Sequence, residues 1–242
     1  MRGPLALLTD FGLADPYVGV MKGVLAGLAP GVPVIDVTHG VPPQDVRLGA
    51  LYLDAAWPWF PEGSVFVCVV DPSVGGPRRA LVAEAAGRTF VGPDNGLLSL
   101  LPAATYVALR LPAVLPSRTF HGRDLFAPVA ARLAMGGSAP DMGEPVVDVV
   151  RLVLPTPEGD VGEVLYVDVF GNAVTNLPGC DAGWIEVAGR RAPVGLTYGA
   201  VEVGETLAVT GSTGRLEIAI REGSAARELG IGPGTRVRVE RG

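Results

Sequence analysis

The stretch VFVCVVDPSVGGPRR, residues 65–79, is the part of the sequence that decides the fold. Its first six residues are apolar and rich in β-branched side chains, which is typical of a buried β-strand. The run breaks at Asp71 into a loop of proline and glycine that ends on Arg78 and Arg79. Strands that are apolar throughout indicate a largely parallel sheet, and such sheets bind ligands beyond the carboxyl ends of their strands. Asp71 is placed at such an end.

Predicted strands and helices alternate around this run. Strands are expected at 4–9, 33–38, 65–70, 79–85, 88–92 and 105–110, and helices at 15–29, 46–57 and 124–135. Asp15 is expected to cap the first helix, with Pro16 at its first position. This order predicts an α/β domain over residues 1–150, with a mostly parallel sheet flanked by helices on both faces.

The second half of the chain has a different period. Residues 137–160 are rich in glycine, proline and acidic residues, which is typical of a linker. Alternating segments follow at 163–169, 184–188, 206–210, 215–220 and 235–240, separated by glycine-rich turns. They predict a smaller C-terminal domain over residues 151–242, built as an antiparallel β-barrel or a β-sandwich.

Composition narrows the possible partners and the compartment. The chain has 242 residues, 48% of them hydrophobic, and a formal net charge of −6, which argues against a nucleic-acid partner. Cys68 and Cys180 have neither metal nor disulfide spacing, so we expect reduced thiols in a cytoplasmic protein. The N-terminal apolar run is too short for a signal peptide, and no apolar stretch has the length of a membrane span.

Common cofactor and metal motifs do not occur. The glycines after the first predicted strand do not form GxGxxG, and neither a Walker loop nor GxSxG is present. The two histidines form no HxH or HExxH pattern, and no CxxC occurs, so nothing favours a catalytic zinc. We therefore expect neither a metal nor a cofactor.

The two histidines have different expected roles. His121, in FHGRD at 120–124, stands before a predicted helix, and with Asp71 and Arg78 it would form a compact charged group if the loops meet. It could equally be a helix cap. His39, in a turn, is more simply explained as a structural residue that satisfies loop carbonyls, and Arg79 as a solvated residue at a strand entrance.

Other polar candidates also have structural explanations. Asp10 follows the first predicted strand and could be a ligand contact or a cap. Asp168 and Asn172, in YVDVFGNAVTN, could belong to a plain turn, and the segment Ser212-Thr213-Gly214 could be a hairpin turn. Taken one at a time, none of these residues identifies a site.

Seven motifs in register nevertheless resemble one family over nearly the whole chain. They are LLTDFGLADPYVGVMKG, VIDVTHGVPPQDVRLGA, FPEGSVFVCVVDPSVGGPRR, VGPDNGLLS, TFHGRDLFAPVAARLA, VDVFGNAVTNL and GSTGRLEIAIREGSAA. The chain resembles the S-adenosyl-L-methionine (SAM) hydroxide adenosyltransferases, the adenosine-forming SAM hydrolases related to fluorinase and chlorinase. The resemblance implies an N-terminal α/β domain, a C-terminal β-barrel and a homotrimer. SAM would bind between the first domain of one subunit and the barrel of its neighbour.

The resemblance also implies site residues. The acid–arginine–histidine triad of the family corresponds to Asp71, Arg78 and His121, and the acid that binds the ribose hydroxyls corresponds to Asp10. Ser73 stands where glycine is more usual, which matters only if that position requires a positive φ. Six barrel residues are implied as substrate contacts: Asp168, Ser212 and Glu217 for the methionine end, and Asn172, Phe170 and Ile220 for the adenine end.

The implied reaction is hydrolysis of SAM to adenosine and L-methionine, by attack of an activated water on the ribose C5′. A halogenase is the first alternative. The halide-pocket positions of fluorinase correspond here to Asp71, Val74 and Gly122, and the inserted loop of the halogenases is missing after residues 81–84. A carboxylate at Asp71 would repel a halide. The second alternative is a binder of SAM or adenosine without catalysis, which would not need all three triad residues.

Overall fold

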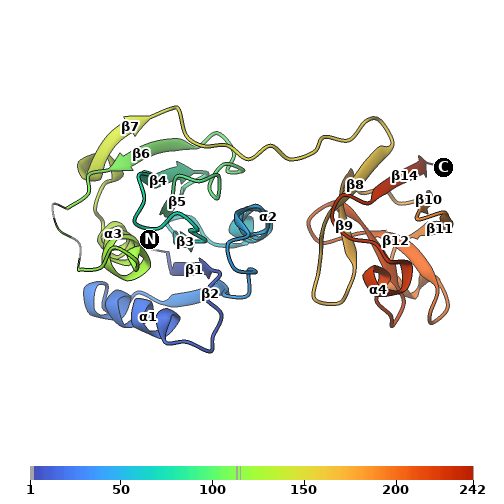
Figure 1. Cartoon of the computed structure of the whole chain (residues 1–242), viewed down its shortest axis with the longest axis horizontal. Coiled ribbons are helices and arrows are strands. Elements are labelled where there is room, and N and C mark those ends of the chain that lie inside the picture. Colours follow the sequence, from blue (N-terminus) through green and yellow to red (C-terminus); the bar gives the residue numbers. More distant parts are fainter. Residues whose placement is uncertain (1–2, 113, 115, 242) are drawn as a thin grey trace. The chain divides into compact units, whose positions relative to one another are not determined.

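The protein is described by a computed structural model that covers residues 3–112, 114 and 116–241. The chain divides into two compact units, Met1–Leu152 and Val153–Gly242, whose elements are labelled in Figure 1. In the described part of the chain, no helix is both long and apolar enough to cross a membrane.

The first unit contains one seven-stranded sheet with the order β2-β1-β3-β5-β4-β6-β7. The strands are β1 (Leu5–Thr9), β2 (Val34–Thr38), β3 (Val65–Val69), β4 (Ala80–Ala85), β5 (Arg88–Pro93), β6 (Thr105–Leu109) and β7 (Gly143–Val146). β2, β1, β3 and β5 run parallel, whereas the pairings that involve β4, β6 and β7 are antiparallel. The predicted α/β class is confirmed, with a mixed sheet whose parallel half contains the expected buried strands.

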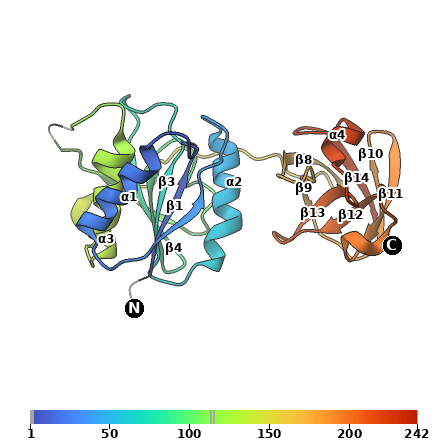
Figure 2. The ribbon, with the colours of Figure 1, turned by 90° about the horizontal axis from the view of Figure 1, so that it is seen from below.

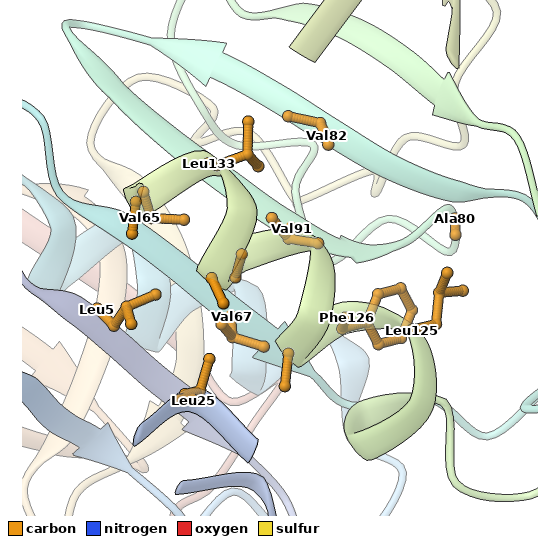
Figure 3. Close-up of a cluster of buried hydrophobic side chains, with 14 of the residues drawn as sticks. Leu5, Leu25, Val65, Val67, Ala80, Val82, Val91, Leu125, Phe126 and Leu133 are labelled. Carbon is orange, nitrogen blue, oxygen red and sulfur yellow. The ribbon is translucent and has the colours of Figure 1, made fainter. Parts of the chain in front are cut away.

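Alternate residues of the central strands fill two separate cores. Leu7 of β1 and Val67 of β3 belong to the core on one face, and Leu8 and Phe66 belong to the core on the other face. Figure 2 shows α1 and α3 on one side of the sheet and α2 on the other. Figure 3 shows the core beneath α1 and α3, where Leu25 lies beside the strand residues. The continuous apolar runs are explained by this burial on both faces.

The helices of this unit largely follow the expected ranges. They are α1 (Tyr17–Leu28), α2 (Val46–Ala56) and α3 (Ala127–Ala134), with a π-turn at Gly122–Phe126 before α3 and 3-10 turns at Trp57–Trp59 and Ala139–Met142. The predicted cap at Asp15 is wrong. Pro16 itself occupies the cap position in a right-handed conformation, and no side chain accepts a hydrogen bond from the first turn. Asp45 does cap α2, since its carboxylate accepts a hydrogen bond from Leu48 N at 2.9 Å.

The predicted linker over 137–160 is wrong in part, because β7 lies inside it and adds the last strand to the sheet. Proline is tolerated in β7 because it is an edge strand. A Cβ on Gly143 would lie only 1.9 Å from the carbonyl oxygen of Ala108, so a glycine is needed for close approach to β6. Glycine and proline here serve strand pairing, which their composition alone does not indicate.

The second unit is a closed barrel with the order β10-β11-β12-β13-β9-β8-β14. Its elements are β8 (Val161–Val167), β9 (Ala173–Pro178), β10 (Gly183–Val187), β11 (Arg190–Gly195), β12 (Thr206–Thr210), β13 (Arg215–Ile220), α4 (Ala225–Leu229) and β14 (Arg236–Arg241). All pairings are antiparallel except that of β11 with β12. The predicted barrel is confirmed, although β9, β11 and the short α4 were not expected.

Candidate active site

The loop after β3 brings an arginine onto an aspartate. Thr9 of β1 pairs with Val69 of β3, so Asp10 and Asp71 leave the sheet from the same edge on neighbouring strands. Asp71 and Arg78 form an ion pair through Asp71 Oδ2 and Arg78 Nη2, and Arg78 Nε lies 3.0 and 3.1 Å from the two carboxylate oxygens. Both side chains are more than nine-tenths buried. Burial strengthens this charge-assisted contact because water does not screen it.

His121 completes the group from the start of the π-turn. Arg78 Nη2 donates to His121 Nδ1 at 2.7 Å. The backbone of His121 occupies the cap position, but its ring makes no capping hydrogen bond, so its side chain is not a helix cap. Burial, followed by the charge of Arg78, lowers the pKa of His121 below its ordinary value. A neutral ring that accepts at Nδ1 carries its proton on Nε2.

A cavity of about 380 Å³ lies at this edge of the sheet. Asp71, His121 and Asp10 line this cavity, together with a wall of aromatic side chains. The wall consists of Phe11, Tyr17 and Phe120, whose ring centroids lie 5.2–6.1 Å apart. Arg78 is not part of the lining, but it contacts two side chains that are. The cavity therefore combines an apolar wall with a polar end, as small-molecule sites commonly do.

Asp10 is both a cavity residue and a loop anchor. Its Oδ2 accepts a hydrogen bond from Gln44 N at 2.8 Å. Gln44 has a φ of +71°, which is uncommon for a residue with a Cβ. Gln44 also lines the cavity, and sequence patterns did not reveal it. A strained residue held against a carboxylate that lines a cavity is typical of functional sites.

His39 has structural contacts, as was favoured, but its ring contacts a hydroxyl and a carboxylate and not the loop carbonyls that were expected. Its Nδ1 lies 2.8 Å from Thr9 Oγ1, and its backbone carbonyl accepts from Gly12 N. Its Nε2 lies 3.1 Å from Asp36 Oδ1, within ion-pair distance. His39 thereby holds both sides of the loop that contains Asp10.

Arg79 is not the solvated residue that was expected. It donates to Asp94 Oδ2 and to Asp148 Oδ1, and its side chain is about one-third exposed. Asp94 also accepts from Val150 N at 2.8 Å. This network joins the chain after β7 to the loop after β5. Among the described residues, none of its hydrogen bonds involves a residue of the cavity lining.

On the barrel, Asp168 organises the turn between β8 and β9. Its Oδ1 accepts from the backbone nitrogens of Phe170 and Asn172, and its Oδ2 accepts from Asn172 Nδ2 at 3.0 Å. The turn interpretation of this segment is therefore correct. Gly171 in the turn has a φ of +88°, and a Cβ there would lie 2.0 Å from Ser224 Oγ. The ring of Phe170 stands 75% exposed at the tip of the turn.

The other barrel candidates lie on or beside β13. Glu217 is buried, and burial, with a smaller contribution from Asp168, raises the pKa of its carboxyl group. Ser212 is exposed in the β12–β13 hairpin turn, as its sequence suggested. Ile220 is 5% exposed and belongs to the barrel core, so its side chain is not displayed on the surface. Tyr198, which the sequence did not suggest, donates to Glu217 Oε2 at 3.2 Å.

The predicted residues thus fall into two groups, each within its own unit. Asp10, Asp71, Arg78 and His121 gather at the sheet edge, whereas the barrel candidates lie around the β8–β9 turn and β13. Ser73 has no positive φ, so its departure from glycine does not strain the triad loop. Among the described residues, no group of three His, Cys, Asp or Glu residues is placed to hold a metal ion.

The chain combines an α/β domain, which has an aspartate–arginine–histidine group at its sheet edge, with a β-barrel. This combination defines a class of two-domain protein. Residues 5–143 match the SAM hydroxide adenosyltransferase N-terminal domain, and residues 162–238 match the C-terminal domain. The chain therefore belongs to the SAM hydroxide adenosyltransferase family.

Individual relatives agree with this assignment. A protein of Thermus thermophilus named (R)-S-adenosyl-L-methionine hydrolase is 47% identical, over an alignment that covers 98% of this chain and 99% of the relative. A fluorinase of Actinopolyspora mzabensis is 29% identical and covers 99% of this chain and 98% of its own. The crystal structure of an uncharacterized conserved protein from Thermotoga maritima superposes with a TM-score of 0.89 at 35% identity, over 98% of this chain and 100% of that one.

Proposed function

We propose that this protein hydrolyses SAM to adenosine and L-methionine, with Asp71, Arg78 and His121 acting on the attacking water. The observation that carries the proposal is the buried arginine that contacts both the carboxylate and the imidazole at the polar end of the cavity. Three relatives that are 47%, 44% and 43% identical to this chain are named (R)-S-adenosyl-L-methionine hydrolase, which supports the same reaction.

The proposed reaction is an in-line displacement at the ribose C5′. The water oxygen forms a bond to C5′, the C5′–S bond breaks, and its electron pair neutralises the sulfonium to give the thioether of methionine. One proton leaves the water. Since Nδ1 of His121 accepts from Arg78, the other ring nitrogen donates a hydrogen bond to the oxygen nucleophile, and Asp71 is the group that can take the proton.

Arg78 would contribute in two ways. It orients Asp71 and His121, and its charge stabilises hydroxide character on the water. Its Nη1 is buried without a hydrogen-bond partner among the described residues, so one donor of the guanidinium is unused. An anionic nucleophile and a cationic substrate neutralise each other at the transition state, and low local dielectric strengthens their attraction.

Halogenation is the less favoured alternative. The three positions that would form a halide pocket, Asp71, Val74 and Gly122, all line the cavity. Asp71 places a carboxylate there, and like charge repels a halide. β4 passes into β5 through the two-residue turn Ala86-Gly87, where both residues have positive φ, so the inserted loop is absent from this hairpin.

We further propose that the cavity binds the ribose of SAM through Asp10, and that barrel residues contact the methionine and adenine ends. Asp168, Ser212 and Glu217 would contact the methionine end, and Asn172, Phe170 and Ile220 the adenine end. Because Ile220 is in the barrel core, its contribution would be to shape the slot from behind. The proposed assembly is a homotrimer in which each site is shared between two subunits. The location of the two residue groups on different units supports it. The proposed compartment is the cytoplasm.

The reaction is tested by incubating the purified protein with SAM, with and without chloride or fluoride, and separating the nucleosides by chromatography. Adenosine should form at the same rate in all samples. In water enriched with ¹⁸O, the label should appear on the C5′ oxygen of adenosine. A halogenated nucleoside would support the halogenase, and SAM that binds but stays intact would support a non-catalytic binder.

A further inference from the structure

A carboxylate and a phenol meet beside the β12–β13 hairpin. Glu217 is buried at 8% exposure, whereas Tyr198, in the 3-10 turn Tyr198–Ala200 before β12, is 46% exposed. The phenol is the donor of their 3.2 Å hydrogen bond, because an ionised carboxylate can only accept. This bond engages Oε2 of Glu217.

The other carboxylate oxygen lies against the hairpin backbone. A Cβ on Gly211 would lie 1.7 Å from Oε1 of Glu217, so any residue other than glycine would displace the carboxylate. The backbone of Gly211 does not have a positive φ, which means that space and not backbone conformation explains the glycine. Gly211 directly precedes Ser212, so the hairpin places the Glu217 carboxylate next to another candidate contact for the methionine end.

The electrostatic environment of Glu217 suits a cationic ligand. Among the described residues, the groups that shift its pKa are the phenol of Tyr198 and the carboxylate of Asp168, and neither is cationic. Burial raises the pKa of Glu217, the hydrogen bond from Tyr198 opposes this rise, and Asp168 adds to it. Two neighbouring carboxylates at a half-buried site are stabilised in their ionised form by an ammonium group.

We propose that Tyr198 is a positioning residue for the methionine end of SAM. Its phenol fixes Glu217 through Oε2, Gly211 provides the space for Oε1, and the oriented carboxylate accepts hydrogen bonds from the substrate amino group. This inference rests on the proposed function, because it deepens the role proposed there for Glu217.

Tyr198→Phe and Gly211→Ala test the arrangement, with Glu217→Gln as reference. Tyr198→Phe should raise the KM for SAM about tenfold, the effect expected for one hydrogen bond to a charged group, while kcat changes little. Gly211→Ala should raise KM at least as much. Neither change should alter the affinity for adenosine by calorimetry, because adenosine has no methionine end.

Two matched controls separate this role from general stability. Tyr106→Phe also removes a phenol hydrogen bond, to the carbonyl of Leu98 at 3.0 Å, but in the first unit. Gly232→Ala adds a Cβ in the barrel where no atom lies within 4 Å. Both controls should leave the KM for SAM unchanged.

A pH profile provides a readout that a merely structural role would not move. Loss of the phenol hydrogen bond lets the pKa of Glu217 rise further. The weakening of SAM binding as pH falls should therefore begin at a higher pH in Tyr198→Phe than in the parent protein.

The outcomes are distinguishable. If Glu217→Gln raises KM while Tyr198→Phe leaves both KM and the pH profile unchanged, the role of Tyr198 is overturned and the methionine-end assignment stands. If Glu217→Gln also binds SAM normally, both that assignment and this inference are wrong, although hydrolysis itself can still be measured. Equal losses of adenosine and SAM affinity in Tyr198→Phe would indicate only a structural defect and would likewise overturn the inference.

Discussion

Nη2 of Arg78 lies 2.7 Å from Nδ1 of His121, and this contact determines how the histidine can act. A guanidinium has donors and no acceptor, so the imidazole must accept at Nδ1. Protonation of Nδ1 would place two donors face to face beside a fixed positive charge. This contact favours a neutral His121 with its proton on Nε2, and the proposed mechanism therefore assigns the proton of the water to Asp71.

The protonation of His121 should be abnormal in a defined direction. Its pKa is lowered first by burial and then by Arg78, so its NMR titration midpoint should fall below the ordinary value of about 6.5. Arg78→Met should move the midpoint upward, because the repulsion is removed. With only two histidines in the chain, His39→Asn assigns the signals. A midpoint above 6.5 in the parent protein would contradict the tautomer.

The same shift has a consequence for stability. A histidine whose pKa is lower in the folded than in the unfolded state contributes stability above about pH 6.5. That contribution is lost as pH falls through the folded pKa. Urea unfolding at pH values from 7.5 to 5 should show that the parent protein loses stability as the pH falls. The loss should be smaller in His121→Gln, because glutamine does not titrate.

Replacement of Arg78 should separate catalysis from binding. Arg78→Ala should lower kcat on the order of a hundredfold or more, the effect typical of losing one preorganised stabiliser. SAM affinity should change far less, because other contacts hold the ligand. Arg110→Ala, which removes an exposed arginine paired with Glu144, is the matched control and should retain full turnover. Near-normal turnover in Arg78→Ala and in His121→Ala would show that the triad residues have only a structural role in their loops.

Asp10 should affect adenosine and SAM equally. A carboxylate that binds ribose hydroxyls contributes about 1.5–3 kcal/mol per hydrogen bond, so Asp10→Ala should weaken both ligands roughly tenfold to a hundredfold. Isothermal titration calorimetry measures both affinities. Asp181→Ala, an exposed barrel carboxylate, is the control. Unchanged adenosine affinity in Asp10→Ala would remove Asp10 from the site.

Gly143 should be sensitive to a single methyl group. A Cβ 1.9 Å from the Ala108 carbonyl oxygen must push β7 away from β6, so Gly143→Ala should destabilise the protein by about 1–3 kcal/mol. Gly27→Ala in α1 meets no atom within 4 Å and should instead be neutral or stabilising by up to about 1 kcal/mol. Equal unfolding midpoints of the two variants in urea would show that β7 adapts freely.

The sequence allowed most of the first unit to be predicted, because its strands are buried on both faces and leave an unbroken apolar signal. β7 was missed because a segment with Gly143 and Pro145 has the composition of a linker. In the structure, Gly143 allows close approach to β6, and Pro145 is tolerated because β7 is an edge strand. β9 and β11 were missed for a related reason, since their polar and apolar residues do not alternate cleanly. In β9, Thr175 is buried and donates to the Leu216 carbonyl.

Candidate residues were predictable to the extent that they belong to motifs. Asp71, Arg78 and His121 were all named from the sequence, but Arg78 and His121 are 43 residues apart, and only the distances show that Arg78 contacts both of the others. Tyr198 lies outside the seven motifs, and Gln44 lies in VIDVTHGVPPQDVRLGA but was not singled out there. They act through one hydrogen bond each, from a phenol in one case and from a backbone nitrogen in the other, and such contacts are visible only in three dimensions.

The alternation of β3 between two cores links the geometry of the cavity to the length of that strand. Successive residues of the strand point to opposite faces of the sheet, so the position of each of its five residues along the strand decides which core its side chain enters. Deleting one residue within Val65–Val69 would exchange the faces of every residue on one side of the cut. Phe66 would then compete for space beneath α3, and Asp71 would emerge on the side of the sheet away from Arg78. We therefore expect insertions and deletions in β3 to abolish activity and folding together, whereas the turn at Ala86-Gly87 should tolerate added residues.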